Sequence, residues 1–398
     1  MTNPRLLGQL SHTHELLEQL FRDLPEADGY RSYAPGLPPL AWYYGRCVYL
    51  ETHWLRAVVQ GDDDLTARVR HLFEPGAAPE EEQWRGLPPR DHLLNWALEI
   101  QDENLMRLAN PGRLPPHPLL AGDRLLSLLL QEQHRIYEQM LAVLCERQLA
   151  NLADGFAVAH PLQPQRIDPA GLMEISQGHY RIGAREPALV YDNELPEQVV
   201  TLSAFRMQRR PLSNAEFLAF LHDDGYTQEG LWSAAGWAWR QRYEVTAPHH
   251  WRRDAAGHWY GVGLNGPFEL VAAEPVLGIS HHEASAFAAW ATQSAEGLRG
   301  AALQHEYQWE VAVRIQALRE FGRAWEWCAN PFHPYTDHPA AADGLGATPP
   351  RAFAGDFSLR GGSLYTQPSL RRPSFRHHAE ASARRLFAGA RLIFPPMD

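Results

Sequence analysis

A few histidine and carboxylate side chains in the first half of the chain have the spacing of a metal site. His134 and Glu138 lie four residues apart in a segment with helical periodicity, so both side chains would project from one face of a helix. A third ligand, for which His53 is the candidate, would complete a set of two histidines and one carboxylate. Non-haem Fe(II) oxygenases use such a set and keep positions on the metal for substrate and O2. The sequence therefore raises the hypothesis of an Fe(II)-dependent oxidoreductase.

The same residues have an interpretation without a metal. Tyr137 lies on the apolar face of the predicted helix, His134 at the edge of that face, and Glu138 further out. A histidine at such a boundary would bond to a backbone carbonyl or to Glu138 itself. His12 and His14 in the first predicted helix are further histidines. The ligand set therefore stays open at this point.

Aromatic residues are the other group that could do chemistry. Trp237 in WSAAGWAW, with Trp325 and Trp327 in the WEW stretch, could wall a pocket for a quaternary ammonium, since aromatic faces attract such cations. Tyr335 is a candidate acid or hydrogen donor, and Tyr137 a candidate substrate contact from the helical half. The alternative is that these side chains pack loops in a fold with little regular structure.

The candidate metal ligands lie in a part of the chain that predicts helices. The candidate aromatic residues lie in a part that predicts a mixture of strands, helices and loops. Apolar residues three and four apart predict helices over about 13–24, 40–59, 61–73, 88–108 and 124–149. Four long helices with proline-rich connections predict a four-helix bundle over residues 1–152. Residues 153–172 lose the periodicity and gain proline, which indicates a linker. Short alternating stretches, helices and long loops over 173–398 predict a loop-rich α+β domain, so the chain is an α+β multidomain protein.

The composition indicates which partners the protein can bind and where in the cell it is expected. A net charge of -11 with no basic cluster excludes a protein that binds the nucleic-acid backbone. The apolar runs are too short for a membrane span and the start of the chain has no signal pattern, so we expect a cytoplasmic protein. Three widely spaced cysteines are typical of reduced, buried thiols.

The second half resembles the formylglycine-generating-enzyme fold, a C-type-lectin-like domain. Eight segments match it in order, covering nearly all of residues 173–392: GHYRIGA, YDNELPEQVVTLSAFRMQRRPLSNAEFLAFLHDDGY, LWSAAGWAW, PVLGISHHEASAFAAW, ALQHEYQWEVAV, GRAWEWCANPFHPY, LRGGSLYTQPSLRRPSFR and ARRLFAGARL. The copper-binding cysteine pair that these enzymes carry after RGGS is missing here. Copper-dependent formylglycine chemistry is therefore excluded.

The upstream helices, together with YDNE and GWAW, resemble the ergothioneine and selenoneine (sulfoxide) synthases, in which a DinB-like bundle precedes the formylglycine-generating-enzyme-like domain. The resemblance implies a mononuclear non-haem Fe(II) that activates O2 and joins the imidazole of a histidine betaine to sulfur or selenium. The implied small-molecule substrates are the betaine and a thiol or selenol donor.

The family's iron-ligand positions are altered in this sequence. The family has one histidine in the second helix and a His-x3-His-x-Glu stretch in the last. The second helix has Arg46 at that position, and one alignment of the last helix places Glu132 and Ile136 at the two histidines. Another alignment starts from His134 and places Glu138 at the second ligand. An always-charged guanidinium cannot bind iron, so the first alignment leaves no triad.

Further positions refine the resemblance. His377 and His378 replace an Asn-Trp-Asp stretch that contacts substrate in relatives, so they are candidates for specificity. Arg360 and Arg376 are expected to be structural and to bond loop carbonyls.

Two functions remain open from the sequence. The first is a non-haem Fe(II), O2-dependent oxidoreductase that forms a C-S or C-Se bond on a histidine betaine. The second is a metal-free degenerate paralogue that binds a small molecule or a partner protein. In the second, Arg46 and Glu132 would form an ion pair inside the former metal site.

Overall fold

The computed structural model describes residues 3–318, 320–339 and 344–396. These residues form two compact units. The first contains residues up to 150 together with 186–191 and the described part of 343–346, and the second contains the rest. None of the described helices combines the length and the apolar composition that a membrane span requires.

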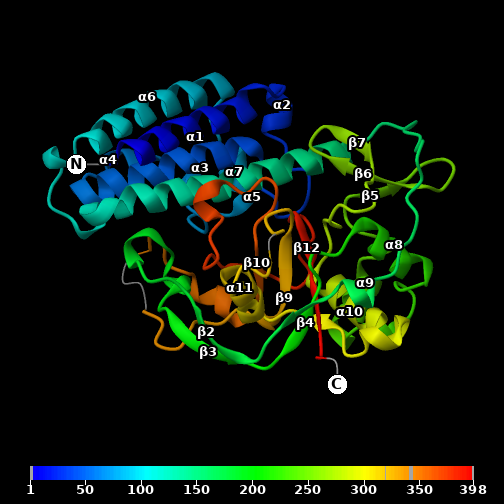
Figure 1. Cartoon of the computed structure of the whole chain (residues 1–398). Helices are drawn as coiled ribbons and strands as arrows, with labels where there is room; N and C mark the ends of the chain where they lie inside the picture. Colours follow the sequence, from blue (N-terminus) through cyan, green and yellow to red (C-terminus); the bar gives the residue numbers. More distant parts are fainter. Residues whose placement is uncertain (1–2, 319, 340–343, 397–398) are drawn as a thin grey trace. The chain divides into compact units, whose positions relative to one another are not determined.

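The first unit is helical (Figure 1). Its α-helices are α1 (Pro4–Arg22), α2 (Glu26–Gly29), α3 (Leu40–Thr52), α4 (Asp64–Phe73), α5 (Glu80–Arg85), α6 (Arg90–Ala109) and α7 (Arg124–Ala150). Both α1 and α3 pack against α6 and α7, so the four long helices form a bundle. The relation of this bundle to the DinB family stays a prediction.

Local sequence explains where α1 begins. The Asn3 side chain accepts a hydrogen bond from the Arg5 backbone N–H at 3.0 Å, and Pro4 occupies the first turn, where it costs no hydrogen bond. Leu10 and Leu17 then bury one face of the helix. The helix therefore starts well before residue 13, where the apolar pattern alone placed it.

The second long helix differs from the prediction in its helical type. The predicted helix over 40–59 is an α-helix only to Thr52, and His53–Gln60 is a π-helix that ends at Gly61 with φ 74. A π-helix has a wider turn than an α-helix. The helical type therefore changes at His53, one of the predicted metal ligands.

The second unit mixes short strands and helices, as the sequence predicts. Its strands are β1 (Met173–Ile175), β2 (Gly178–Ile182), β3 (Gln198–Leu202), β4 (Phe205–Met207), β5 (Trp251–Arg253), β6 (Trp259–Gly263), β7 (Gly266–Glu269), β8 (Ala302–Leu303), β9 (Trp325–Pro331), β10 (Phe357–Arg360), β11 (His377–Ala379), β12 (Ala388–Ala390) and β13 (Leu392–Phe394). They form four sheets with the strand orders β1-β4-β13-β8, β11-β10-β9-β12, β2-β3 and β5-β6-β7.

Four α-helices complete the described part of the second unit: α8 (Asn214–His222), α9 (Ala234–Arg242), α10 (His281–Ser294) and α11 (Glu306–Arg314). Capping boxes start two of them, from Ser213 with Glu216 before α8 and from Ser280 with Glu283 before α10. The helix α11 packs on β9 and β10 and brings two carboxylates into the core of the unit.

Candidate functional site

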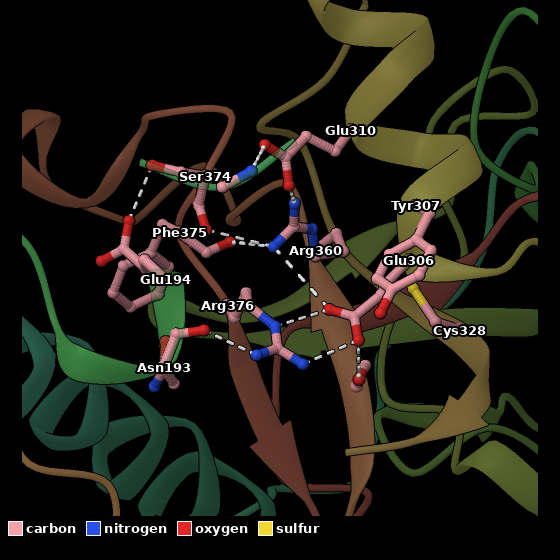
Figure 2. Close-up of polar contacts among 12 residues, drawn as sticks. Asn193, Glu194, Glu306, Tyr307, Glu310, Cys328, Arg360, Ser374, Phe375 and Arg376 are labelled. Carbon is pink, nitrogen blue, oxygen red and sulfur yellow. Dashed lines mark hydrogen bonds and ion pairs between the residues drawn. The ribbon is translucent and has the colours of Figure 1, made fainter. Parts of the chain in front are cut away.

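An ionic core holds the loops of the second unit (Figure 2). Glu306 on α11 accepts two hydrogen bonds from Arg376. The donors are Nε at 2.7 Å and Nη2 at 2.8 Å. Arg360 on β10 pairs with Glu310, one turn further along α11. All four side chains are at most 2% exposed. Because each carboxylate meets a guanidinium, the core is balanced in charge despite its burial.

The two arginines of this core also bind the backbone. Arg360 donates to the carbonyls of Ser374 and Phe375 at 3.2 and 3.0 Å, and Arg376 donates to the carbonyl of His333 at 2.7 Å. The expectation that both arginines are structural and bond loop carbonyls is confirmed. Burial alone would raise the pKa of Glu306, but Arg376 and Arg360 outweigh it and hold this pKa at about 2.

Tyr335 belongs to the same core. Its hydroxyl donates to Glu310 Oε2 at 3.4 Å, and the guanidinium carbon of Arg376 lies 4.1 Å from its ring centre. Burial and then Glu310 raise its pKa well above the ordinary value of 10, so the hydroxyl keeps its proton. The structure thus places the expected acid inside the scaffold, with 3% of its surface exposed.

The predicted substrate-binding tryptophans occupy different environments. Trp327 is fully buried, and its indole N–H donates to the carbonyl of Ile279 at 2.9 Å, so it packs the core. Trp325 on β9 lies beside His377 on β11, with ring centres 4.9 Å apart. Trp237 on α9 is half-buried under the guanidinium of Arg240. Among these residues, the structure brings together Trp325 and His377.

His378 forms a dyad with Asp356. Its Nδ1 lies 2.7 Å from Asp356 Oδ2, and its ring stacks on Phe332 with centres 4.7 Å apart. Both members of the dyad are about one-fifth exposed, at 18% and 20%. A carboxylate on Nδ1 favours the tautomer in which Nδ1 carries the hydrogen. The dyad is therefore suited to proton transfer.

A pocket of about 360 Å³ opens in the second unit, at residues that the sequence analysis did not single out. Trp251 and Trp259 contribute aromatic walls with ring centres 5.8 Å apart. Arg252, Arg253 and Arg384 add guanidinium groups, and that of Arg253 lies 4.4 Å from the Trp259 ring centre. Such a pocket suits a ligand that carries a carboxylate beside an apolar or cationic group.

The bundle does not assemble the expected metal ligands. His134 is buried, with Nε2 3.0 Å from the Thr13 hydroxyl, and burial lowers its pKa to about 4. His53 is half-buried and stacks on Tyr49 with ring centres 5.8 Å apart. In the described part of the bundle, no three His, Cys, Asp or Glu ligand atoms gather within 4.8 Å. The set of His134, Glu138 and His53 is therefore not formed in this structure, and Tyr137 lies half-buried against the bundle core.

The bundle core does contain another polar cluster, which the sequence analysis missed. His14 Nε2 lies 2.8 Å from Glu51 Oε2, and Gln133 Nε2 lies 3.0 Å from the same oxygen. The three residues come from α1, α3 and α7. Leu126, Gln133 and Met140 recur every seven residues and are all buried, so a polar residue on the apolar stripe of α7 was the available signal.

Comparison with known proteins covers both units. Residues 159–320 match the model of the sulfatase-modifying factor enzyme 1-like domain. Hercynine oxygenase from Mycolicibacterium thermoresistibile is 30% identical over 94% of this chain and 91% of its own. The chain belongs to the hercynine oxygenase family, and with it to the oxidoreductases. Hercynine oxygenase from Mycobacterium tuberculosis is 33% identical over 53% of this chain and 57% of its own.

A second group of relatives matches a smaller part of the chain. Formylglycine-generating enzyme from Thermomonospora curvata is 32% identical over 38% of this chain and 50% of its own. The resemblance to a family that combines an upstream domain with a formylglycine-generating-enzyme-like domain is thus confirmed.

Within the hercynine oxygenase family, the altered ligand positions have concrete contacts in this chain. Arg46 donates to the carbonyl of Phe73 at 2.9 Å, and Ile136 packs in the apolar core. Glu132 accepts hydrogen bonds from Tyr191 at 2.7 Å and from Arg135 at 3.3 Å.

The predicted ion pair between Arg46 and Glu132 stays a prediction. Arg46 donates to the Phe73 carbonyl and Glu132 pairs with Arg135, while burial lowers the pKa of Arg46 and the charge of Glu132 acts to raise it. A guanidinium, an alkyl group and an already paired carboxylate do not fit a metal ion at these positions.

Proposed function

We propose that this protein is an O2-dependent oxidoreductase that acts on a histidine betaine of the hercynine type. One observation carries the proposal: the similarity to a hercynine oxygenase extends over 94% of this chain and so includes both units. The match to the formylglycine-generating enzyme from Thermomonospora curvata covers only 38% of this chain, so it supports the proposal less than the hercynine oxygenase does.

The pocket in the second unit supports this substrate class. A histidine betaine carries a carboxylate next to a quaternary ammonium. Arg252 and Arg253 offer guanidinium groups to the carboxylate, and Trp251 and Trp259 offer aromatic faces to the ammonium. The guanidinium of Arg253 lies 4.4 Å from the Trp259 ring centre, so the cationic and aromatic groups line the same pocket side by side.

We further propose that the oxidation joins the imidazole of the betaine to a thiol or selenol donor. In the balanced reaction, the imidazole C–H and the S–H or Se–H bonds break and a C-S or C-Se bond forms. One atom of O2 is transferred to the sulfur or selenium, and the other leaves as water. We assign His378, which Asp356 orients, as the side chain that accepts the proton of the donor.

Fe(II) is the cofactor that the resemblance implies, and it would supply O2 activation. Positions 46, 132 and 136 do not fit a metal ion, so we derive no step through iron there.

The test of this function is direct. The full chain is incubated with hercynine, O2 and either cysteine or a selenol, with and without Fe(II), while O2 uptake and product mass are recorded. We expect hercynine and O2 to be consumed together. The Arg253→Met variant should raise KM about tenfold or more, which corresponds to about 1.4 kcal/mol of lost carboxylate binding. Arg209→Met, which changes an exposed arginine outside the pocket, is the matched control.

A second candidate function is a metal-free binding protein for the same class of ligand. The contacts of Arg46 and Ile136 favour it, since both side chains occupy expected ligand positions without being able to bind a metal. Titration calorimetry separates the two functions. Hercynine binding that is weakened by Arg253→Met, without O2 uptake under any condition, would support the second function and contradict the first.

A further inference from the structure

We propose that the core of the helical bundle holds a divalent transition-metal cation at His14, Glu51 and Gln133. The site differs from positions 46, 132 and 136, where the resemblance placed iron. It rests on the described residues of the bundle alone and does not depend on the proposed function.

The three potential donor positions form a compact triangle. Its sides are 2.8 Å from His14 Nε2 to Glu51 Oε2, 3.0 Å from Glu51 Oε2 to the Gln133 amide, and 3.4 Å from that amide to His14 Nε2. Neighbouring ligands about 2.1 Å from a metal and at right angles to each other lie about 3 Å apart. The triangle thus has the size of one face of a coordination sphere.

Burial makes the cluster costly without a cation. Glu51 is fully buried, Gln133 is 1% exposed and His14 is 7% exposed. Glu51 Oε1 and Gln133 Oε1 are buried and have no hydrogen-bond partner among the described residues. Buried carboxylate and amide oxygens without a donor are rare, because each loses its hydration without compensation. Two such oxygens leave the cluster short of donors, and a cation bound to the same side chains would offset that cost.

The side-chain amide of Gln133 can provide an oxygen ligand to the cation if its oxygen and nitrogen exchange places. Its oxygen and nitrogen have nearly the same shape, and their assignment follows from the surrounding hydrogen bonds. In the present orientation, Nε2 faces Glu51 and Oε1 is unpartnered. Rotation by half a turn would present the oxygen to the triangle and supply a third donor. The resulting set of imidazole nitrogen, carboxylate and amide oxygen suits Fe(II), Mn(II) or Zn(II).

A neighbouring contact holds the helices in place. Thr13 and His134, next to His14 and Gln133 in the chain, are 3.0 Å apart between the hydroxyl and Nε2. The Thr13 hydroxyl donates to the carbonyl of Gln9 at 2.8 Å, so it accepts from His134. This contact joins α1 to α7 beside the triangle and fixes the distance between two of the ligands.

The experiment uses the full chain without substrate. Chelator-treated protein is equilibrated without oxygen with Fe(II), Mn(II) or Zn(II) and desalted, and bound metal is counted by elemental mass spectrometry. Thermal unfolding is recorded with and without each cation. We expect about one cation per chain and a raised unfolding midpoint for the wild type. His14→Gln and Glu51→Gln should weaken the affinity more than about 100-fold.

His12→Gln is the matched control, since His12 lies two residues from His14 on the same helix but its side chain is 67% exposed. It should keep the cation. Circular dichroism shows whether each variant is folded, and the wild-type result decides even if a variant is not. A wild type that takes up no cation and shows no thermal shift would overturn the proposal. Equal affinity in Glu51→Gln and the wild type would also overturn it. Loss of hercynine oxidation changes neither readout, so the two proposals fail separately.

Discussion

The two units bury their carboxylates in opposite ways. In the ionic core of the second unit, Glu306 and Glu310 each meet a guanidinium. In the bundle, Glu51 is equally buried, but one of its oxygens has no hydrogen-bond partner among the residues that the structure describes. The first arrangement needs nothing further and holds loops together. The second leaves a buried oxygen that the proposed cation would compensate, so the difference contrasts a scaffold with the proposed binding site.

The largest expected effect is in the ionic core. Arg376→Ala leaves Glu306 buried without its bidentate partner, so the free energy of unfolding should fall by about 3–5 kcal/mol. Urea unfolding measures it. Arg181→Ala is the control, because Arg181 is 63% exposed and its pair with Glu197 is worth at most about 1 kcal/mol. Equal losses in the two variants would remove the contrast between buried and surface pairs.

The pH dependence of unfolding sharpens the same contrast. The pKa of Glu306 is held at about 2, against an ordinary value of 4.5. The carboxylate therefore stabilises the fold above about pH 4.5, and this contribution is lost as the pH falls toward 2. The loss is up to about 3 kcal/mol. Glu306→Gln should flatten the unfolding profile between these values, and an unchanged slope would contradict the assignment.

A somewhat smaller effect is expected from the cation in the bundle. At about 100 times its dissociation constant, a ligand that binds only the folded state adds about 2.7 kcal/mol of stability. Wild-type protein should gain this amount with the cation it binds, whereas Glu51→Gln should gain nothing. Calorimetric unfolding at matched cation concentrations compares them, and a gain in both proteins would place the cation elsewhere.

The smallest effect is expected at Arg46. Arg46→Met removes one hydrogen bond to the Phe73 carbonyl, so the change in stability should be about 1 kcal/mol. Cation binding should be unchanged. A much larger loss would mean that Arg46 has a charged partner in solution, as the sequence first suggested.

Much of the fold follows from local patterns. The apolar periodicity predicts α7 over 124–149, and the helix spans Arg124–Ala150. The segment QVVTLSAFRMQ forms two strands, and GHYRIGA pairs with the first of them. These elements can be predicted because the periodicity of apolar side chains indicates which face of a helix or strand is buried. The π-helix at His53–Gln60 could not be predicted in this way, because no proline or glycine within the segment separates it from the α-helix before it.

The polar cluster of His14, Glu51 and Gln133 was harder to predict than the helices, because it depends on which side chains of different helices contact each other. His134 and Glu138 have the spacing of metal ligands, yet His134 contacts Thr13 of another helix. Glu51 and Gln133 look ordinary in the sequence and become notable only once both are buried together. The prediction that Arg360 and Arg376 bond loop carbonyls was correct, although Arg360 itself lies on β10.

Anomalous X-ray diffraction tests the central contrast most directly. Crystals of the full chain equilibrated with Zn(II) or Fe(II) are measured at the absorption edge of the metal. We expect one strong peak within bonding distance of His14 Nε2 and Glu51, and none in the core formed by Glu306 and Arg376. A peak beside Glu132, or no peak in the bundle, would contradict it.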